Sequence, residues 1–280
     1  MAHGLAWLVK ALKESAAQRV VRLVRFGALL MLGSLAGCGG GGSEPSGTQP
    51  SATMSLEAPT WLNSGVHVMS LGDSLTEGWP STYGGYRFEL YRRFIAAKLP
   101  VNFVGSLTNT STGLPDPNHE GHGGWTSYDL RDGRPNALDA GNVRNWLAAE
   151  HPEVILLLAG TNDVFYTQGD ETIAANLLAL IDRIRELAPN AELFVGSTLP
   201  LRDPQLSGRV TRFNALVQQG LVTRMQLDAR LHSVATHDAV SVDDLADDGV
   251  HLRPEGAGNA KLADAWFGAI RSTLERLNAR

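Results

Sequence analysis

The sequence predicts an α/β fold built as a three-layer α/β/α sandwich, with helices on both faces of a parallel sheet. From residue 64 onward, short apolar runs alternate with segments of helical periodicity, which is typical of this fold class. The run Val-Ile-Leu-Leu-Leu-Ala at 154–159 is apolar without alternation, as expected for a strand covered on both faces. Because strands joined by helices make right-handed crossovers, the strands should run parallel.

Five strands and three long helices are predicted. The helix over 173–187 carries one apolar stripe, and Pro189 with Asn190 ends it. Two more helices are predicted over 210–230 and 254–277, the last with Pro254 in its first turn. Ligands of a parallel sheet bind outside the carboxyl ends of its strands, so polar motifs that follow a strand are candidate site residues. The predicted strands are 66–71, 101–105, 154–159, 193–197 and 231–236.

The amino-terminal residues resemble a bacterial lipoprotein signal peptide. Five basic residues precede an apolar segment at 26–36, which is shorter than the about 20 residues of a membrane span. The sequence then reads Leu-Ala-Gly-Cys38, similar to the lipoprotein box in which the cysteine is acylated and becomes the first residue. We expect a signal peptide at 1–37 and a lipid on Cys38 that anchors the protein in a bacterial cell envelope, with Gly39 favouring the outer membrane. The alternative is an ordinary secretory signal, an incidental cysteine and a secreted protein.

The rest of the chain is expected to form one domain on a tether. Residues 38–63 are rich in Gly, Ser, Pro and Thr, which predicts a flexible linker to a single domain at 64–280. The chain has one cysteine in 280 residues, which excludes an internal disulfide. Removing residues 1–37 takes away five basic residues and one acidic residue, so the formal net charge changes from −5 to −9. An acidic domain without basic clusters is a poor candidate for binding nucleic acid, and its membrane contact would be made through the lipid.

A Gly-Asp-Ser turn follows the first predicted strand and suggests a nucleophile. It places the Ser74 hydroxyl at the carboxyl end of a strand and beside the start of a helix, where backbone N–H groups can stabilise an anion. The same tripeptide is common in ordinary turns, so this interpretation depends on partners elsewhere in the chain.

The segment 106–126 is predicted to be a long loop, and it contains His119-Glu-Gly-His122-Gly-Gly124-Trp. Its glycines allow backbone to approach a ligand closely, so Gly124 could offer its N–H to a developing oxyanion; an ordinary turn glycine is the alternative. The two histidines suggest a metal, but no third ligand has the spacing of a known site, and the motif is not the helical zinc motif His-Glu-x-x-His. We therefore predict neither a metal nor a cofactor.

Two further motifs supply partners for Ser74. Asn162, in Gly-Thr-Asn-Asp after the third strand, could donate a side-chain N–H to the oxyanion, or could simply cap the next helix. His251, ahead of the last helix, can reach the same edge and deprotonate a serine, and Asp248 can orient its ring. Asp247 is the alternative orienting acid, and a solvated loop side chain is the alternative for the histidine.

In this order, the four motifs resemble the SGNH hydrolases, the GDSL-type serine esterases. Gly-Asp-Ser, Gly, Gly-x-Asn-Asp and Asp-x-x-His are all present, and the resemblance spans residues 66 to about 268. It implies a flavodoxin-like α/β/α sandwich with a five-stranded parallel sheet and catalysis without a metal cofactor. It also implies Ser74 as nucleophile, His251 as base, Asp248 as its partner, and the Ser74 N–H, Gly124 and Asn162 as oxyanion donors.

Four segments narrow the resemblance: Gly-Gly-Tyr-Arg at 84–87, and residues 102–106, 116–125 and 210–214. They resemble carbohydrate esterase family three, which includes secreted acetylxylan esterases. A tryptophan at Trp125 is characteristic of that group, whereas Gly123 stands where its members often have serine. Trp125, Trp79 and Tyr86 could line the substrate pocket and stack on a sugar, with core or loop packing as the alternative for each.

The sequence thus predicts a lipid-anchored serine esterase that removes acetyl or other short acyl groups from O-acetylated carbohydrate or another small ester. The first alternative is a lipolytic enzyme, a lysophospholipase or thioesterase, because an anchor would place it beside lipids. Against this, no long apolar stretch flanks the Ser74 motif as a wall for an acyl chain. The second alternative is an inactive, anchored glycan-binding protein, against which the intact Ser74, Asn162 and His251 argue.

Overall fold

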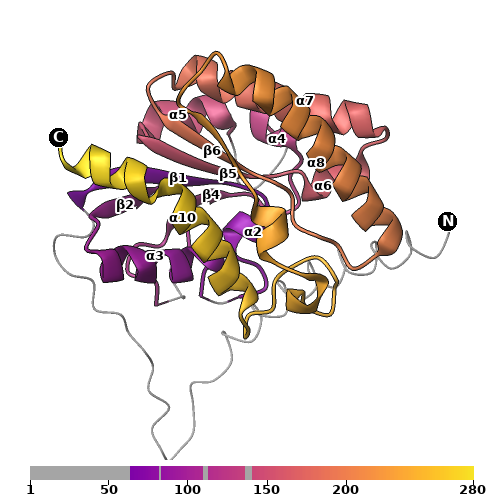
Figure 1. Ribbon diagram of the computed structural model, residues 1–280, viewed down its shortest axis with the longest axis horizontal. Coiled ribbons are helices and arrows are strands. Elements are labelled where there is room, and N and C mark those ends of the chain that lie inside the picture. The colour runs from indigo at the N-terminus through magenta and orange to yellow at the C-terminus, as the bar shows by residue number, and fades with distance from the viewer. Residues whose placement is uncertain (1–63, 82, 110–112, 136–140) are drawn as a thin grey trace, which may run out of the picture. The chain divides into compact units, whose positions relative to one another are not determined.

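The computed structural model describes residues 64–81, 83–109, 113–135 and 141–280. The signal peptide predicted at 1–37, Cys38 and the tether at 38–63 lie outside the described residues and stay predictions. In the described part, helices pack on both faces of a central sheet, which confirms the predicted α/β/α layering (Figure 1). No helix in those ranges is long and apolar enough to cross a membrane.

All five predicted strands are present and form the parallel body of the sheet: β1 (Val66–Gly72), β2 (Val101–Val104), β5 (Val154–Leu158), β6 (Glu192–Gly196) and β7 (Leu231–Val234). They lie in the order β2-β1-β5-β6-β7. Since all five run the same way, their carboxyl ends meet at one edge of the sheet, where ligands bind in such folds. This carboxyl edge carries the loops that follow β1 and β5.

The predicted number of strands was wrong, because the described part of the sheet has seven. The two additional strands, β3 (Leu107–Thr108) and β4 (Asn118–Gly121), lie in the segment predicted to be a loop. β3 pairs antiparallel with β4, and β4 pairs parallel with the last residues of β1. β4 reads Asn-His-Glu-Gly and has no apolar side chain, so hydropathy gives no strand signal, although His119 and Glu120 are buried.

The three long predicted helices are present with shifted ends. α7 (Asp170–Leu187) ends where predicted, whereas α8 (Pro204–Met225) begins earlier because Asp203 caps it and Pro204 suits its first position. α10 (Gly258–Asn278) begins after Pro254, so the placement of that proline in its first turn was wrong; Gly256, with φ +149°, interrupts the helical backbone. The shorter helices are α2 (Ser74–Glu77), α3 (Tyr86–Ala97), α4 (Ser127–Asp132), α5 (Val143–Glu150), α6 (Thr161–Tyr166), α9 (Thr236–Ala239) and the 3-10 helix η2 (Val242–Asp244).

Alternate residues of the central strands point into two separate hydrophobic cores. In β5, Val154, Leu156 and Leu158 pack with α3 and α10, whereas Ile155 and Leu157 pack with α5, α7 and α8. Figure 1 shows these two groups of helices on opposite faces of the sheet. This two-sided burial explains why the strand is apolar without alternation.

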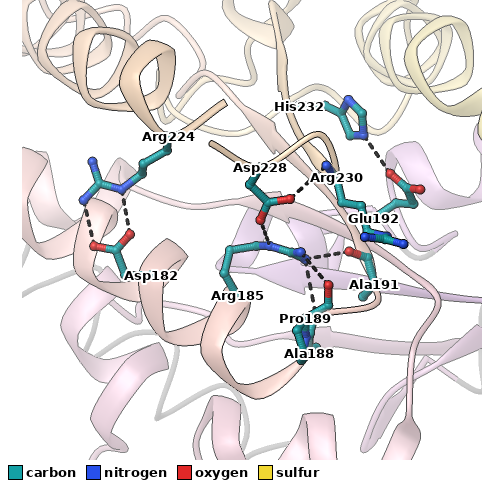
Figure 2. Close-up of polar contacts among 10 residues, drawn as sticks. All are labelled: Asp182, Arg185, Ala188, Pro189, Ala191, Glu192, Arg224, Asp228, Arg230 and His232. Atoms are coloured by element: carbon teal, nitrogen blue, oxygen red, sulfur yellow. Dashed lines mark hydrogen bonds and ion pairs between the residues drawn. The ribbon is translucent and has the colours of Figure 1, made fainter. Parts of the chain in front are cut away.

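Polar contacts tie helix ends to the amino edge of the sheet (Figure 2). Arg185, at the end of α7, donates to Asp228 Oδ2 at 2.7 Å and to the Ala191 carbonyl at 2.6 Å. Glu192, at the start of β6, accepts from His232 Nε2 of β7 at 2.9 Å. These contacts fix the chain connections at the edge opposite to the polar motifs.

A hollow of about 380 Å³ opens at the amino edge, among the ends of α5, α7 and α10. Among the described residues that line it, there is no serine, threonine or cysteine. Within the described part of the chain, the predicted nucleophile thus lies at the carboxyl edge and not in this hollow.

Candidate active site

Ser74 lies at the carboxyl end of β1, as the sequence predicts. It is the first residue of α2, and Asp73 caps this helix by accepting the Leu75 N–H at 3.0 Å. A Cβ at Gly72 would lie 2.0 Å from the Leu158 carbonyl oxygen of β5, so only glycine fits there. The chain thus turns tightly from strand to helix and leaves the Ser74 side chain partly exposed.

Ser74, His251 and Asp248 form a chain of hydrogen bonds. Ser74 Oγ lies 2.8 Å from His251 Nε2, and His251 Nδ1 lies 2.7 Å from Asp248 Oδ2. The other carboxylate oxygen of Asp248 accepts the N–H groups of Val250 at 2.9 Å and His251 at 3.0 Å. Burial alone would raise the pKa of Asp248, but the contacts with His251 and these N–H groups lower it to about 2. An ionised Asp248 favours the proton on Nδ1 and leaves Nε2 able to accept the serine proton.

Arg202 holds the loop that carries Asp248 and His251. Its N–H donates to the Gly249 carbonyl at 2.9 Å. Gly249 has φ +70°, and a Cβ there would lie 2.8 Å from the Cβ of Arg202, so both conformation and space require glycine. Asp247, the alternative orienting acid, is exposed, and it is Asp248 that faces the imidazole.

Gly124 and Asn162 come together at the same edge. Asn162, in the first turn of α6, donates one side-chain N–H to the Trp125 carbonyl at 2.9 Å, which leaves the second hydrogen of that amide. Gly124 has φ +79° in a turn closed by the Trp125 N–H and the His122 carbonyl at 3.1 Å. A Cβ at Gly124 would meet none of the described residues within 4 Å, so this glycine borders open space.

Gly121 and Gly123 bring the loop after β4 against α2. A Cβ at Gly121 would lie 2.2 Å from the Glu77 backbone nitrogen. A Cβ at Gly123 would lie 2.4 Å from Glu77 Oε2 and 3.9 Å from Ser74 Cβ. The Glu77 carboxylate therefore takes up the space that a serine at position 123 would need.

Buried Arg87 joins the same two segments. Its guanidinium donates to the carbonyl oxygens of Thr76 at 2.9 Å and Glu77 at 3.3 Å, at the end of α2. It also donates to those of Pro117 at 3.3 Å and Asn118 at 3.4 Å, at the start of β4. Burial lowers the pKa of Arg87 to about 10, so it stays protonated at neutral pH. Arg87 lies in the segment 84–87 that resembles carbohydrate esterase family three. Its role could not be predicted from the sequence, because a residue of any type can supply a backbone carbonyl as acceptor.

The segment 210–214 supports the position of Asn162. Gly160 has φ +117°, and a Cβ there would lie 2.5 Å from the Phe213 ring and 2.6 Å from Thr198 Oγ1. Asn214 exchanges two hydrogen bonds with the Thr198 backbone, at 3.0 and 2.9 Å. Asn162 therefore starts its helix from a closely packed turn.

The two histidines of the β4 segment have partners inside the protein. His119 Nδ1 accepts the Gly121 N–H at 3.0 Å, and burial lowers the pKa of this histidine to about 2, so it is neutral. His122 Nε2 lies 2.7 Å from Glu120 Oε1, and its ring stacks on Trp146 with centroids 4.3 Å apart. Among the residues that the structure describes, no three His, Cys, Asp or Glu side chains gather as metal ligands.

Of the three aromatic residues expected around the pocket, one is accessible. Trp79 is 52% exposed, whereas Trp125 is 2% and Tyr86 0% exposed. Trp125 packs on His122 with ring centroids 4.6 Å apart, and Tyr86 packs near Trp266 at 6.4 Å. The expectation that Trp125 and Tyr86 stack on a sugar is therefore wrong. Both rings pack in the interior, which was the alternative for each.

Two buried carboxyl groups belong to the same motifs. Asp73 and Asp163 are both 0% exposed, and burial raises the pKa of each from 3.8 to about 6. One oxygen of each carboxyl has no hydrogen-bond partner among the described residues. The charge of Asp163 adds a smaller contribution to the raised pKa of Asp73, after the effect of burial.

These raised pKa values predict that Asp73 and Asp163 each contribute stability that is lost as the pH rises from about 4 through 6. In that window these two carboxyls bind more protons in the folded state than in the unfolded state, so their contribution to the free energy of unfolding falls as pH increases. A shift of about two units in one carboxyl corresponds to roughly 2–3 kcal/mol. We expect Asp163→Asn to reduce the fall in unfolding free energy between pH 4.5 and 7 by about 2 kcal/mol, measured by urea unfolding.

Asp182→Asn is the control for this measurement, because Asp182 is an exposed carboxylate paired with Arg224 at the surface. It should leave the pH dependence as in the parent protein. Equal pH dependence in the parent protein and Asp163→Asn would contradict the prediction.

The model of the GDSL-like lipase/acylhydrolase family matches residues 70–258, which is more than half of the chain. The chain therefore belongs to this family, and the protein is an ester hydrolase of the GDSL class. This agrees with the fold and with a serine at the carboxyl end of β1.

Solved structures and a curated relative add more particular similarities. A family 3 carbohydrate esterase from Clostridium thermocellum is 30% identical, with 76% of this chain and 99% of that chain covered and a TM-score of 0.65. A family 3 carbohydrate esterase from Talaromyces cellulolyticus shares the fold, at 24% identity, 75% and 99% coverage and a TM-score of 0.63. The protein of Acetivibrio thermocellus that carries the provisional name endoglucanase X is 28% identical over 143 residues, 50% of this chain. That match spans 58% of the length of the curated relative.

Proposed function

We propose that the protein is a serine esterase that removes acetyl or other short acyl groups from O-acetylated carbohydrate, with Ser74 as nucleophile. The observation that carries this assignment is the hydrogen-bond chain from Ser74 Oγ to His251 Nε2 at 2.8 Å and from His251 Nδ1 to Asp248 Oδ2 at 2.7 Å. A serine hydroxyl is a weak nucleophile unless a base takes its proton, and this geometry supplies the base and its orienting acid.

In the first half-reaction, Ser74 Oγ attacks the ester carbonyl carbon while its proton passes to His251 Nε2. The carbonyl electron pair moves to the oxygen and gives a tetrahedral oxyanion. When the intermediate collapses, the bond to the sugar oxygen breaks, and that oxygen takes the proton from His251. Asp248 stabilises the imidazolium that exists between these two proton transfers.

The oxyanion is stabilised by the Ser74 N–H, the Gly124 N–H and the remaining side-chain N–H of Asn162. Loss of one such donor typically costs about 2.7–4 kcal/mol of transition-state stabilisation. In the second half-reaction, His251 deprotonates water, which attacks the acyl-serine, and the acid leaves as Ser74 regains its proton.

Exposed aromatic rings at the carboxyl edge support carbohydrate as the substrate. Trp79 follows α2, Tyr128 lies in α4 and Tyr166 at the end of α6, and their exposures are 52%, 51% and 50%. Trp and Tyr combine a flat apolar face with a polar group, which suits contact with a partly polar partner such as a sugar ring. The similarity to the family 3 carbohydrate esterase of Clostridium thermocellum points in the same direction.

A chain-length series of p-nitrophenyl esters, together with acetate release from acetylated xylan, pectin, chitin oligomers and cell-wall glycan, tests the substrate class. We expect kcat/KM to be highest for acetate and to fall as the acyl chain lengthens, and we expect acetate release from at least one of the acetylated glycans. A maximum at eight carbons or more would favour a lipolytic enzyme and contradict the acetylesterase assignment.

We also propose that Cys38 carries a lipid that anchors the enzyme in the bacterial cell envelope, at the outer membrane. The support is the sequence Leu-Ala-Gly-Cys after an apolar segment, together with the Gly/Ser/Pro-rich stretch at 38–63. Cys38→Ala should release the protein from the membrane fraction, whereas unchanged fractionation would contradict the anchor.

A further inference from the structure

Arg134, just after α4, reaches back to the turn at 122–125, which we call the oxyanion turn. Its Nη2 donates to the Gly124 carbonyl at 2.7 Å and to Asp129 Oδ2 at 2.6 Å. Its guanidinium carbon lies 5.5 Å from the centroid of the Trp125 ring. Arg134 therefore contacts both the backbone and a side chain of this turn.

The other partner of Arg134 is itself fixed in place. Asp129 Oδ2 also accepts the Thr126 N–H at 2.9 Å and the Thr126 hydroxyl at 2.8 Å, in a capping box that starts α4. Burial alone would raise the pKa of Asp129, but the bonds to Arg134 and Thr126 lower it overall, which keeps the carboxylate ionised. The guanidinium is thus anchored to the first turn of a helix and not merely to a mobile side chain.

Gly124 has no side chain through which neighbouring residues could hold it. Glycine moves readily between backbone conformations, and a Cβ here would meet none of the described residues within 4 Å. The peptide between Gly124 and Trp125 is held at both ends: its oxygen accepts from Arg134, and its N–H donates to the His122 carbonyl at 3.1 Å. Without Arg134, one of these two restraints is lost.

A movement of this turn would reach a second proposed donor. Asn162 donates its side-chain N–H to the Trp125 carbonyl at 2.9 Å, so the position of its amide depends on the same stretch of backbone. One arginine thus stabilises the backbone on which both Gly124 and Asn162 depend.

We infer that Arg134 is a positioning residue for ester hydrolysis, which holds the oxyanion turn so that Gly124 and Asn162 point at the developing oxyanion. This inference rests on the proposed function of Ser74, Gly124 and Asn162. The oxyanion exists only after attack on the carbonyl, so loss of Arg134 should lower kcat and leave KM nearly unchanged. Misplacement of a catalytic group by about 1 Å can cost roughly 100-fold in rate.

The test compares Arg134→Ala, Arg134→Lys and Arg131→Ala in the purified protein. Arg131 is a matched control: it also pairs with a neighbouring aspartate, Asp132, at 2.7 Å, and lies 5.2 Å from the Tyr128 ring. Within the described part of the chain, its hydrogen bonds go to Asp132 and do not reach the oxyanion turn.

With p-nitrophenyl acetate, we expect Arg134→Ala to lower kcat by roughly 10- to 100-fold with KM within about threefold. Arg134→Lys, which keeps a positive charge and an N–H donor but not the planar guanidinium, should lose less, and Arg131→Ala should stay within about twofold. The affinity for a small alkylboronic acid, whose adduct with serine carries a negative tetrahedral boron, should fall in parallel with kcat. The melting temperature is measured for each variant. Partial unfolding would not lower kcat and the affinity for the boronic acid together while KM and the melting temperature stay unchanged.

A wild-type kcat for Arg134→Ala, or an equal loss in Arg131→Ala, would overturn the inference. If Arg134→Ala does not fold, the comparison of Arg134→Lys with Arg131→Ala decides by the same criteria. Ser74→Ala is measured in the same series: hydrolysis unchanged by that substitution would refute the proposed function, and the inference with it. If hydrolysis depends on Ser74 but is unchanged by the substitution of Arg134, the inference is refuted and the proposed function is not.

Discussion

Ser74→Ala should reduce kcat for p-nitrophenyl acetate by about 10⁶-fold, leaving only the acceleration that the oxyanion donors and substrate binding supply. The alanine has no oxygen to form the acyl-enzyme, and a water in its place would lack the fixed 2.8 Å contact with His251 Nε2. Because Ser74 is partly exposed and its Oγ bonds to a loop histidine, we expect little change in the melting temperature. The measurement is the steady-state rate together with a thermal unfolding curve.

Ser81→Ala is the control for this substitution. Ser81 lies in the loop that follows α2, and its Oγ accepts the Tyr83 N–H at 3.0 Å. It should leave kcat within about twofold of the parent protein. If Ser74→Ala kept hydrolysis at the parent rate, catalysis by Ser74 would be excluded.

Asp248→Asn should lower kcat by about 10⁴-fold while Asp247→Asn leaves it nearly unchanged. The Asp248 carboxylate accepts from His251 Nδ1 at 2.7 Å, whereas an asparagine can turn its NH₂ group toward that nitrogen and stabilise the wrong tautomer. Nε2 would then carry the proton and could not accept another from Ser74. Asp247 is next in the chain and exposed, so the pair separates the role of one carboxylate from that of local charge.

Rates for the two variants are best compared across a range of pH, with the melting temperature as the check on folding. Equal loss in Asp248→Asn and Asp247→Asn would show that charge in the loop, and not the contact with Nδ1, supports the reaction. A wild-type rate for Asp248→Asn would contradict its role as the partner of His251.

The parallel body of the sheet could be predicted because its strands obey a simple rule. β5 and β6 are buried on both faces by helices, so they read as continuous apolar runs. β4 is a strand without such an apolar run. Its His119 and Glu120 are buried through hydrogen bonds to Gly121 and Ser106, and a polar strand satisfied by such contacts looks like a loop in the sequence.

The site was predictable to the extent that its residues follow strands. Ser74 and Asn162 follow β1 and β5, whose carboxyl ends a parallel sheet must bring together. The roles of Arg87 and Arg134 could not be predicted, because both arginines act on backbone carbonyls and no residue type marks such an acceptor. The sequence left open whether Trp125 stacks on a substrate or packs in the core, because its contact with Trp146 forms only in the folded chain.

Labelling with a fluorophosphonate ester identifies the nucleophilic residue directly. Its phosphorus reacts with an activated serine and leaves a stable tetrahedral adduct, so mass spectrometry of the digested protein identifies the nucleophile. We expect one adduct, on Ser74, that forms with the loss of esterase activity and is abolished in His251→Ala. Inactivation with the adduct on another residue, or full activity with Ser74 labelled, would contradict this expectation.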